Sequence, residues 1–128
     1  MLIYLASPYT PMNGESPEER VEIVTKVAAK LMAKGYIVFS PIVHSHPIAD
    51  HLPESLRFDH QFWMNQDLPI LERCDQLIVL RLPGWDKSKG IAHEMVFAEE
   101  KGIRIGYINR EDIEDATIVY DSGYAARI

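Results

Sequence analysis

Residues 75–108 read DQLIVLRLPGWDKSKGIAHEMVFAEEKGIRIGYI, and this stretch decides the fold of the chain. The apolar run at 77–80 predicts a buried strand, which a proline and a glycine end. Residues 87–101 then lead from a loop into a helix, because apolar side chains recur there every three or four positions. A second apolar strand follows at 103–108. A strand, a helix and a strand in this order predict a parallel sheet.

The rest of the chain continues the alternation of strands and helices. A strand is predicted at 2–6. A helix is predicted from Ser16, where a serine, a proline and Glu19 form a capping box, to Gly35. The remaining predicted elements are a strand at 36–40, an irregular proline-rich and histidine-rich excursion at 41–54, a helix from about 55 to 68 that Pro69 interrupts, and a possible fifth strand at 117–120.

The order of elements predicts an α/β fold with three layers. It is an open parallel sheet, flavodoxin-like or Rossmann-like, with four or five strands and helices on both faces. The chain has 128 residues, and two halves would be too small to bury good cores. We therefore expect a single domain over 1–128.

Composition excludes several classes of partner. The formal net charge is −6, which argues against binding to a nucleic acid polymer through a basic surface. No apolar run approaches the roughly 20 residues that a membrane helix needs, so no membrane partner is expected. The single cysteine, Cys74, and the lack of a secretory signal at the start predict a cytoplasmic protein.

Ligands of open parallel sheets bind beyond the carboxyl ends of the strands, so we expect a binding site among the loops there. Ser88, Lys89 and Gly90 precede a helix, and the free N–H groups at a helix start favour an anion. The same three residues also fit a plain helix cap with solvated lysines. Neither a dinucleotide-binding glycine motif nor a P-loop is present, so those two classes of site are not supported.

Two carboxylates are candidates for chemistry. Glu94 shares the apolar stripe of its predicted helix, where an unpaired carboxylate is costly. Asp67 precedes the break at Pro69 and is placed to reach the carboxyl end of a strand. A glutamate that turns outward and an acidic surface residue are the structural alternatives. Near a helix start, Glu94 is expected to stay ionised.

Taken together, these residues resemble the nucleoside 2-deoxyribosyltransferase-like family, which includes 2′-deoxynucleoside 5′-monophosphate N-glycosidases. The similarity covers nearly the whole chain. It rests on the opening strand and small-residue loop at 3–8 (IYLASP), on Asp67 followed eight residues later by Asp75, and on 88–94 (SKGIAHE). The last segment resembles the signature that places a nucleophilic glutamate early in a helix.

The resemblance implies a role for each matching residue. Glu94 would attack the anomeric carbon C1′, Asp67 would handle the proton on the departing base, and Tyr4 would orient the glutamate or the sugar. Ser88 would face the 5′ end of the sugar, where a serine is typical of the branch that hydrolyses nucleotides. The implied substrate-binding residues are Ser7, Ser88, Lys89 and Gly90.

The resemblance also implies the reaction and its partners. It implies cleavage of an N-glycosidic bond or deoxyribosyl transfer on a nucleoside or nucleoside 5′-monophosphate, with no metal and no cofactor. It implies a homo-oligomer, for which Phe58, Phe62 and Trp63 would supply apolar area. Residues 121–124 (DSGY) loosely match a tail that completes a neighbouring subunit's site.

Two other functions stay open. A non-catalytic nucleotide-binding or sensor domain would use the same fold, because a fold alone does not define an activity. A metal-dependent hydrolase would use the histidines between 44 and 60, since His44 and His46 in an extended segment would point both rings to one side.

Overall fold

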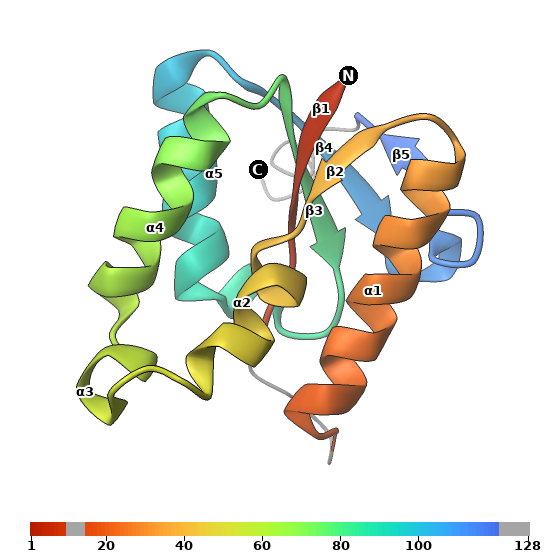
Figure 1. Cartoon of the computed structure of the whole chain (residues 1–128). Helices are drawn as coiled ribbons and strands as arrows, with labels where there is room; N and C mark the ends of the chain where they lie inside the picture. The colour runs from red at the N-terminus through yellow and green to blue at the C-terminus, as the bar shows by residue number, and fades with distance from the viewer. Residues whose placement is uncertain (10–14, 121–128) are drawn as a thin grey trace.

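A five-stranded sheet forms the centre of the molecule, and the computed structural model describes residues 1–9 and 15–120 (Figure 1). The strand order is β2-β1-β3-β4-β5. The first four strands run parallel, as predicted, whereas β5 pairs with β4 in the antiparallel sense. The strands are β1 (Leu2–Ala6), β2 (Ile37–Phe39), β3 (Gln76–Arg81), β4 (Arg104–Asn109) and β5 (Ile118–Val119).

Helices cover both faces of this sheet, which confirms the predicted three-layer α/β class (Figure 1). One face packs against α1 and the other against α4 and α5. Within the part of the chain that the structure describes, no helix combines the length and the apolar character needed to cross a membrane. The helices are α1 (Pro17–Ala33), α2 (Pro41–Ala49), α3 (Glu54–Arg57), α4 (His60–Glu72) and α5 (Lys89–Lys101), with short 3₁₀ turns at Trp85–Lys87 and Arg110–Asp112.

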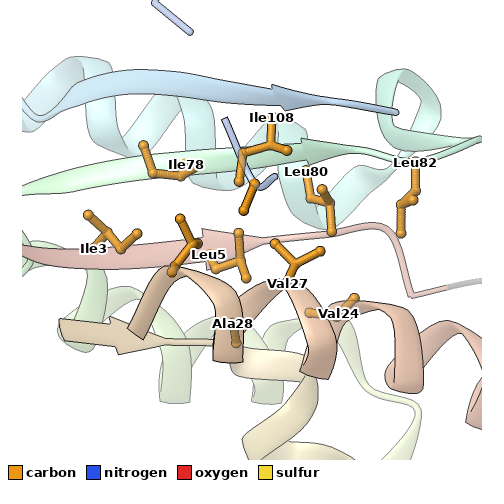
Figure 2. Packing of buried hydrophobic residues seen from close by; sticks show 11 residues of the cluster. Ile3, Leu5, Val24, Val27, Ala28, Ile78, Leu80, Leu82 and Ile108 are labelled. Atoms are coloured by element: carbon orange, nitrogen blue, oxygen red, sulfur yellow. The ribbon is translucent and has the colours of Figure 1, made fainter. Parts of the chain in front are cut away.

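Each sheet face carries its own apolar cluster because side chains alternate along a strand. Ile3 and Leu5 of β1 point toward Val24 and Val27 of α1 (Figure 2). Tyr4 of β1 points to the opposite face, toward α4 and α5. β1 therefore sends alternate residues into two different cores.

The predicted excursion at 41–54 is wrong over much of its length, because residues 41–49 form the helix α2. Ser40 caps this helix by accepting the backbone N–H of Val43 at 3.3 Å, and Pro41 occupies the first turn. The prolines had suggested an interruption, yet a proline at a helix start is favourable.

The predicted break at Pro69 is also wrong, because α4 continues through it to Glu72. A proline inside a helix removes one backbone hydrogen bond and is unfavourable. Met64 and Leu71 are buried on either side of it. Their burial, with Leu71 packed against side chains of the sheet, opposes that penalty and keeps the helix intact.

Arg20 is the largest fully buried side chain and links two loops that border the carboxyl edge of the sheet. Its guanidinium donates to the backbone oxygen of Pro8 at 2.9 Å, after β1, and to that of Pro83 at 3.3 Å, after β3. It also forms a 2.7 Å ion pair with Glu15. One buried cation thus holds both loops in position.

Replacing this arginine tests the link. We expect Arg20→Met to lower the free energy of unfolding by about 2 kcal/mol or more, because it leaves buried carbonyl oxygens without a donor. Urea unfolding monitored by circular dichroism gives the value. Lys26→Met, on the exposed side of the same helix, is the matched control and should stay within about 0.5 kcal/mol of the unmodified protein. Equal effects of the two changes would contradict the proposed link.

Candidate active site

A hydrogen bond between β1 and α5 places a carboxyl group inside the protein. The hydroxyl of Tyr4 donates to Oε2 of Glu94. Tyr4 has no exposed surface and Glu94 is 5% exposed. Glu94 lies on the buried stripe of α5 together with Ile91 and Ala98, as its spacing predicts. The tyrosine satisfies a carboxyl group that would otherwise be costly to bury.

A second acidic side chain reaches the same region from α4. Asp67 is 6% exposed, and its charge acts on both Tyr4 and Glu94. Asp75 is placed differently, because it lies just before β3 and accepts the backbone N–H of Leu2 at 2.8 Å. The structure therefore brings Asp67 to Glu94 and leaves Asp75 at the opposite end of the sheet.

Burial determines the protonation of these two carboxyl groups. It raises the pKa of Glu94 to about 8; the Asp67 charge adds to this rise and the Tyr4 hydrogen bond opposes it. Burial alone raises the pKa of Asp67 to about 6. The expectation that Glu94 stays ionised is therefore not met at neutral pH. Glu94 lies in the second turn of α5, where the dipole of the helix has little effect and burial dominates.

A cavity of about 1040 Å³ opens beside Glu94 at the carboxyl edge of the sheet. The residues that line it come from the loop after β1, the start of α1, the segment from α2 to α4, the loop after β3 and the start of α5. The predicted residues on its wall are Ser7, Asp67, Ser88, Lys89, Gly90 and Glu94. Tyr4 lies behind Glu94, where it holds the carboxyl group from the core.

The start of α5 meets the cavity with a capped turn. Ser88 Oγ accepts the backbone N–H of Ile91 at 3.2 Å, so the serine caps the helix and lines the cavity at once. Lys89 is exposed beside it. Ser7 approaches from the other side, and its Oγ is buried without a hydrogen-bond partner among the residues that the structure describes.

The segment from α2 to α4 supplies a wall of the cavity, whereas the sequence suggested a metal site for its histidines and a subunit contact for its aromatic residues. Its lining residues include His46, Arg57, Phe58, His60 and Trp63. The Ser40–Pro41 pair, a helix start like Ser16–Pro17, was the signal that would have placed α2 there.

The histidines do not form the extended pair that the metal hypothesis assumed. His44 and His46 lie two positions apart in α2, and such positions face different sides of a helix. Nδ1 of His46 lies 2.8 Å from the Tyr9 hydroxyl, while Nε2 of His60 lies 3.3 Å from Nδ1 of His93. Across residues 1–9 and 15–120, no group of three or more potential metal ligands occurs.

The aromatic residues proposed as a contact surface differ from one another. Phe58 is 78% exposed, as predicted, and lies at the cavity. Phe62 and Trp63 are half-buried, and Nε1 of Trp63 donates to the backbone oxygen of Arg57 at 2.8 Å. The predicted tail segment, 121–124, lies outside the described residues.

Most of the chain matches a known protein family. Residues 1–109 match the family model described as Domain of unknown function (DUF1937). The chain belongs to this family. No curated protein matches the DUF1937 chain.

A solved structure shares the architecture of this DUF1937 protein. It is that of a 2-deoxyribosyltransferase from the psychrotolerant bacterium Bacillus psychrosaccharolyticus, with 25% sequence identity and a TM-score of 0.63. The match covers 85% of this chain and 72% of that one. The similarity supports the predicted relationship to nucleoside 2-deoxyribosyltransferases and the three-layer fold.

The buried carboxyl group makes the stability of the DUF1937 protein depend on pH. The folded state holds the proton of Glu94 up to a pH of about 8, whereas its ordinary pKa is 4.5. The resulting stabilisation is complete below about pH 4.5 and is lost as the pH rises through about 8. We expect Glu94→Gln to unfold roughly 5 °C or more above the unmodified protein at pH 9, and at a similar temperature at pH 5.

Thermal unfolding at a series of pH values measures this difference. Glu99→Gln, on the exposed side of the same helix, is the control and should follow the unmodified protein throughout. A temperature difference for Glu94→Gln that does not change with pH would contradict the assignment of the buried proton to Glu94.

Proposed function

We propose that this protein cleaves the N-glycosidic bond of a 2′-deoxynucleoside or its 5′-monophosphate, with Glu94 as the nucleophile. The observation that carries the proposal is the buried Glu94 carboxyl group, held by the Tyr4 hydroxyl at the wall of a large cavity. The similarity to a 2-deoxyribosyltransferase supports this class of reaction.

The first step separates the base from the sugar. A carboxylate oxygen of Glu94 forms a bond to C1′ while the bond from C1′ to the base nitrogen breaks and its electron pair leaves with the base. Asp67 donates a proton to that base, which makes it a better leaving group. The positive charge that develops on the sugar is stabilised by the adjacent carboxylate of Glu94.

The two pKa values describe how the reactive form arises. At pH 7 the proton favours Glu94, whose pKa is about 8, over Asp67, whose pKa is about 6. Transfer of this one proton from Glu94 to Asp67 produces a nucleophile and an acid together, without change in the total charge. Two neighbouring carboxyl groups thereby take the two different roles that the reaction needs.

The second step releases the sugar. Water attacks C1′ of the glycosyl ester and gives hydrolysis, or a nitrogen of a second base attacks and gives transfer. In both cases the bond from C1′ to Glu94 breaks and the carboxylate is restored. Asp67, deprotonated in the first step, accepts the proton of the incoming water or base. The chemistry needs no metal and no cofactor.

Residues at the start of α5 fit a phosphate at the 5′ end of the sugar. Ser88 lines the cavity between Lys87 and Lys89, and free backbone N–H groups at a helix start favour an anion. An acidic residue at position 88 would repel a phosphate. We therefore propose the 5′-monophosphate as the preferred form of the substrate, with Ser7 and Gly90 contributing to its binding.

Removal of the nucleophile tests the reaction. We expect Glu94→Gln to lower the rate of base release from deoxynucleoside monophosphates at least about 10³-fold, because no covalent intermediate forms. Tyr4→Phe should lower it by a smaller factor, roughly 10-fold to 100-fold, because the glutamate loses its positioning donor. Chromatography of the released base gives the rates, and Glu99→Gln is the control.

The outcomes separate an enzyme from a binding domain. Base release that survives in Glu94→Gln would overturn the role of Glu94. Nucleotides that raise the unfolding temperature of the unmodified protein but are returned unchanged would instead favour the non-catalytic sensor.

The preference for a phosphate has its own test. Ser88→Asp keeps a residue that caps helices well but adds a negative charge at the cavity. We expect kcat/KM to fall about 10-fold to 100-fold for a monophosphate, with a much smaller change for the free nucleoside. Steady-state kinetics on both substrates, with Ser88→Asn as the uncharged control, decide it. Parallel losses on both substrates would contradict a phosphate at this position.

A further inference from the structure

The order of the strands divides the cavity into two sides. β1 lies between β2 and β3, so the loop that follows β1 lies between α2 and the start of α5. Tyr9 in that loop and His46 in α2 both line the cavity. A substrate beside Glu94 therefore has the start of α5 on one side and the Tyr9 and α2 residues on the other.

These two sides differ in charge. Lys87 and Lys89 line the cavity at the start of α5, whereas the carboxylates of Glu18 and Asp50 line it near Tyr9. Arg57 also lines the cavity, where its guanidinium donates to the backbone oxygen of Asp50 at 3.4 Å and to that of Leu52 at 3.1 Å. A phosphate is attracted to the lysines and repelled by the two carboxylates. A bound nucleotide with its phosphate at α5 would consequently extend its base toward Tyr9.

The polar groups near Tyr9 form a chain across three elements, which we call the Tyr9–His46–Glu18 chain. The Tyr9 hydroxyl lies 2.8 Å from Nδ1 of His46, and Nε2 of that ring lies 3.6 Å from a carboxylate oxygen of Glu18. We assign the ring proton to Nε2, because the acceptor Glu18 faces that nitrogen, so Nδ1 accepts from the tyrosine. With its hydrogen directed at His46, the Tyr9 oxygen offers only lone pairs to a ligand.

Resting on the proposed function, we infer that the Tyr9–His46–Glu18 chain recognises the base and selects bases that carry an exocyclic amino group. The chain and Asp50 present hydrogen-bond acceptors to the cavity, so a base edge that donates is favoured. An oxo group in the place of the amino group would set acceptor against acceptor. Cytosine and adenine nucleotides are therefore preferred over their uracil and hypoxanthine counterparts.

Matched substrates that differ in one group test this selection. We expect the unmodified protein to favour dCMP over dUMP, and dAMP over dIMP, by about 10-fold or more in kcat/KM. Glu18→Gln introduces an amide that also donates, so both ratios should fall toward 1. Tyr9→Phe should reduce them in the same direction. Glu22→Gln changes an exposed glutamate on the same helix and should leave both ratios unchanged.

Binding to the Glu94→Gln variant separates this inference from the proposed reaction. Calorimetric titration with dCMP, dUMP, dAMP and dIMP gives affinities whether or not the unmodified protein turns them over. Tighter binding of the amino partners without turnover would support the base selection and overturn the proposed reaction. Equal affinities and equal rates within each pair, or no binding of any of the four nucleotides, would overturn the base selection.

Discussion

The hydrogen bond from Tyr4 to Glu94 is the constraint on which the site depends. A carboxyl group on the buried stripe of a helix needs a donor, and Tyr4 provides one from a fully buried position in the sheet. Tyr4 pairs with Phe39 of β2 and Leu77 of β3 in the sheet register, so strands on both sides fix its backbone. The position of Glu94 is thus determined by the sheet and not by a loop. Burial also raises the pKa of Glu94. The same surroundings therefore position the carboxyl group and determine whether it carries a proton.

The loops around the cavity depend on a second buried polar group. Arg20 donates to backbone oxygens after β1 and after β3, and both of these loops supply residues that line the cavity. A fully buried guanidinium is stable only where acceptors surround it, and here the two loops and the Glu15 carboxylate provide them. These hydrogen bonds and the ion pair offset the cost of burying one cation and of ordering two segments that carry cavity residues. The sequence does not indicate this, because an arginine in the first turns of an amphipathic helix is ordinarily exposed.

The features that could be predicted from the sequence are those that a local pattern of residues determines. Apolar runs located the strands, the capping box located α1, and the three-residue and four-residue spacing around Glu94 placed it on a buried stripe. The predictions were wrong where a proline begins a helix or lies inside one. The packing that stabilises α2 and α4 comes from other segments of the chain, so a local pattern does not reveal it. The contacts of Tyr9 with His46 and the raised pKa of Glu94 are likewise tertiary effects. Neither spacing nor composition encodes the distance between residues 37 or 90 positions apart.

The carboxyl pair and the charged residues around the cavity fit the same proposed reaction. Glu94 and Asp67 share a buried site in which two full negative charges are unfavourable, so one proton is retained between them near neutral pH. The pair then carries about one negative charge, which in the proposed reaction matches the single positive charge that forms on a sugar as its base departs. In that proposal, the lysines at the start of α5 and the carboxylates near Tyr9 set the direction in which a nucleotide lies across the pair. The proposed orientation and the proposed activation thus depend on different residues, so a change near Tyr9 would alter the choice of substrate without disturbing the carboxyl pair.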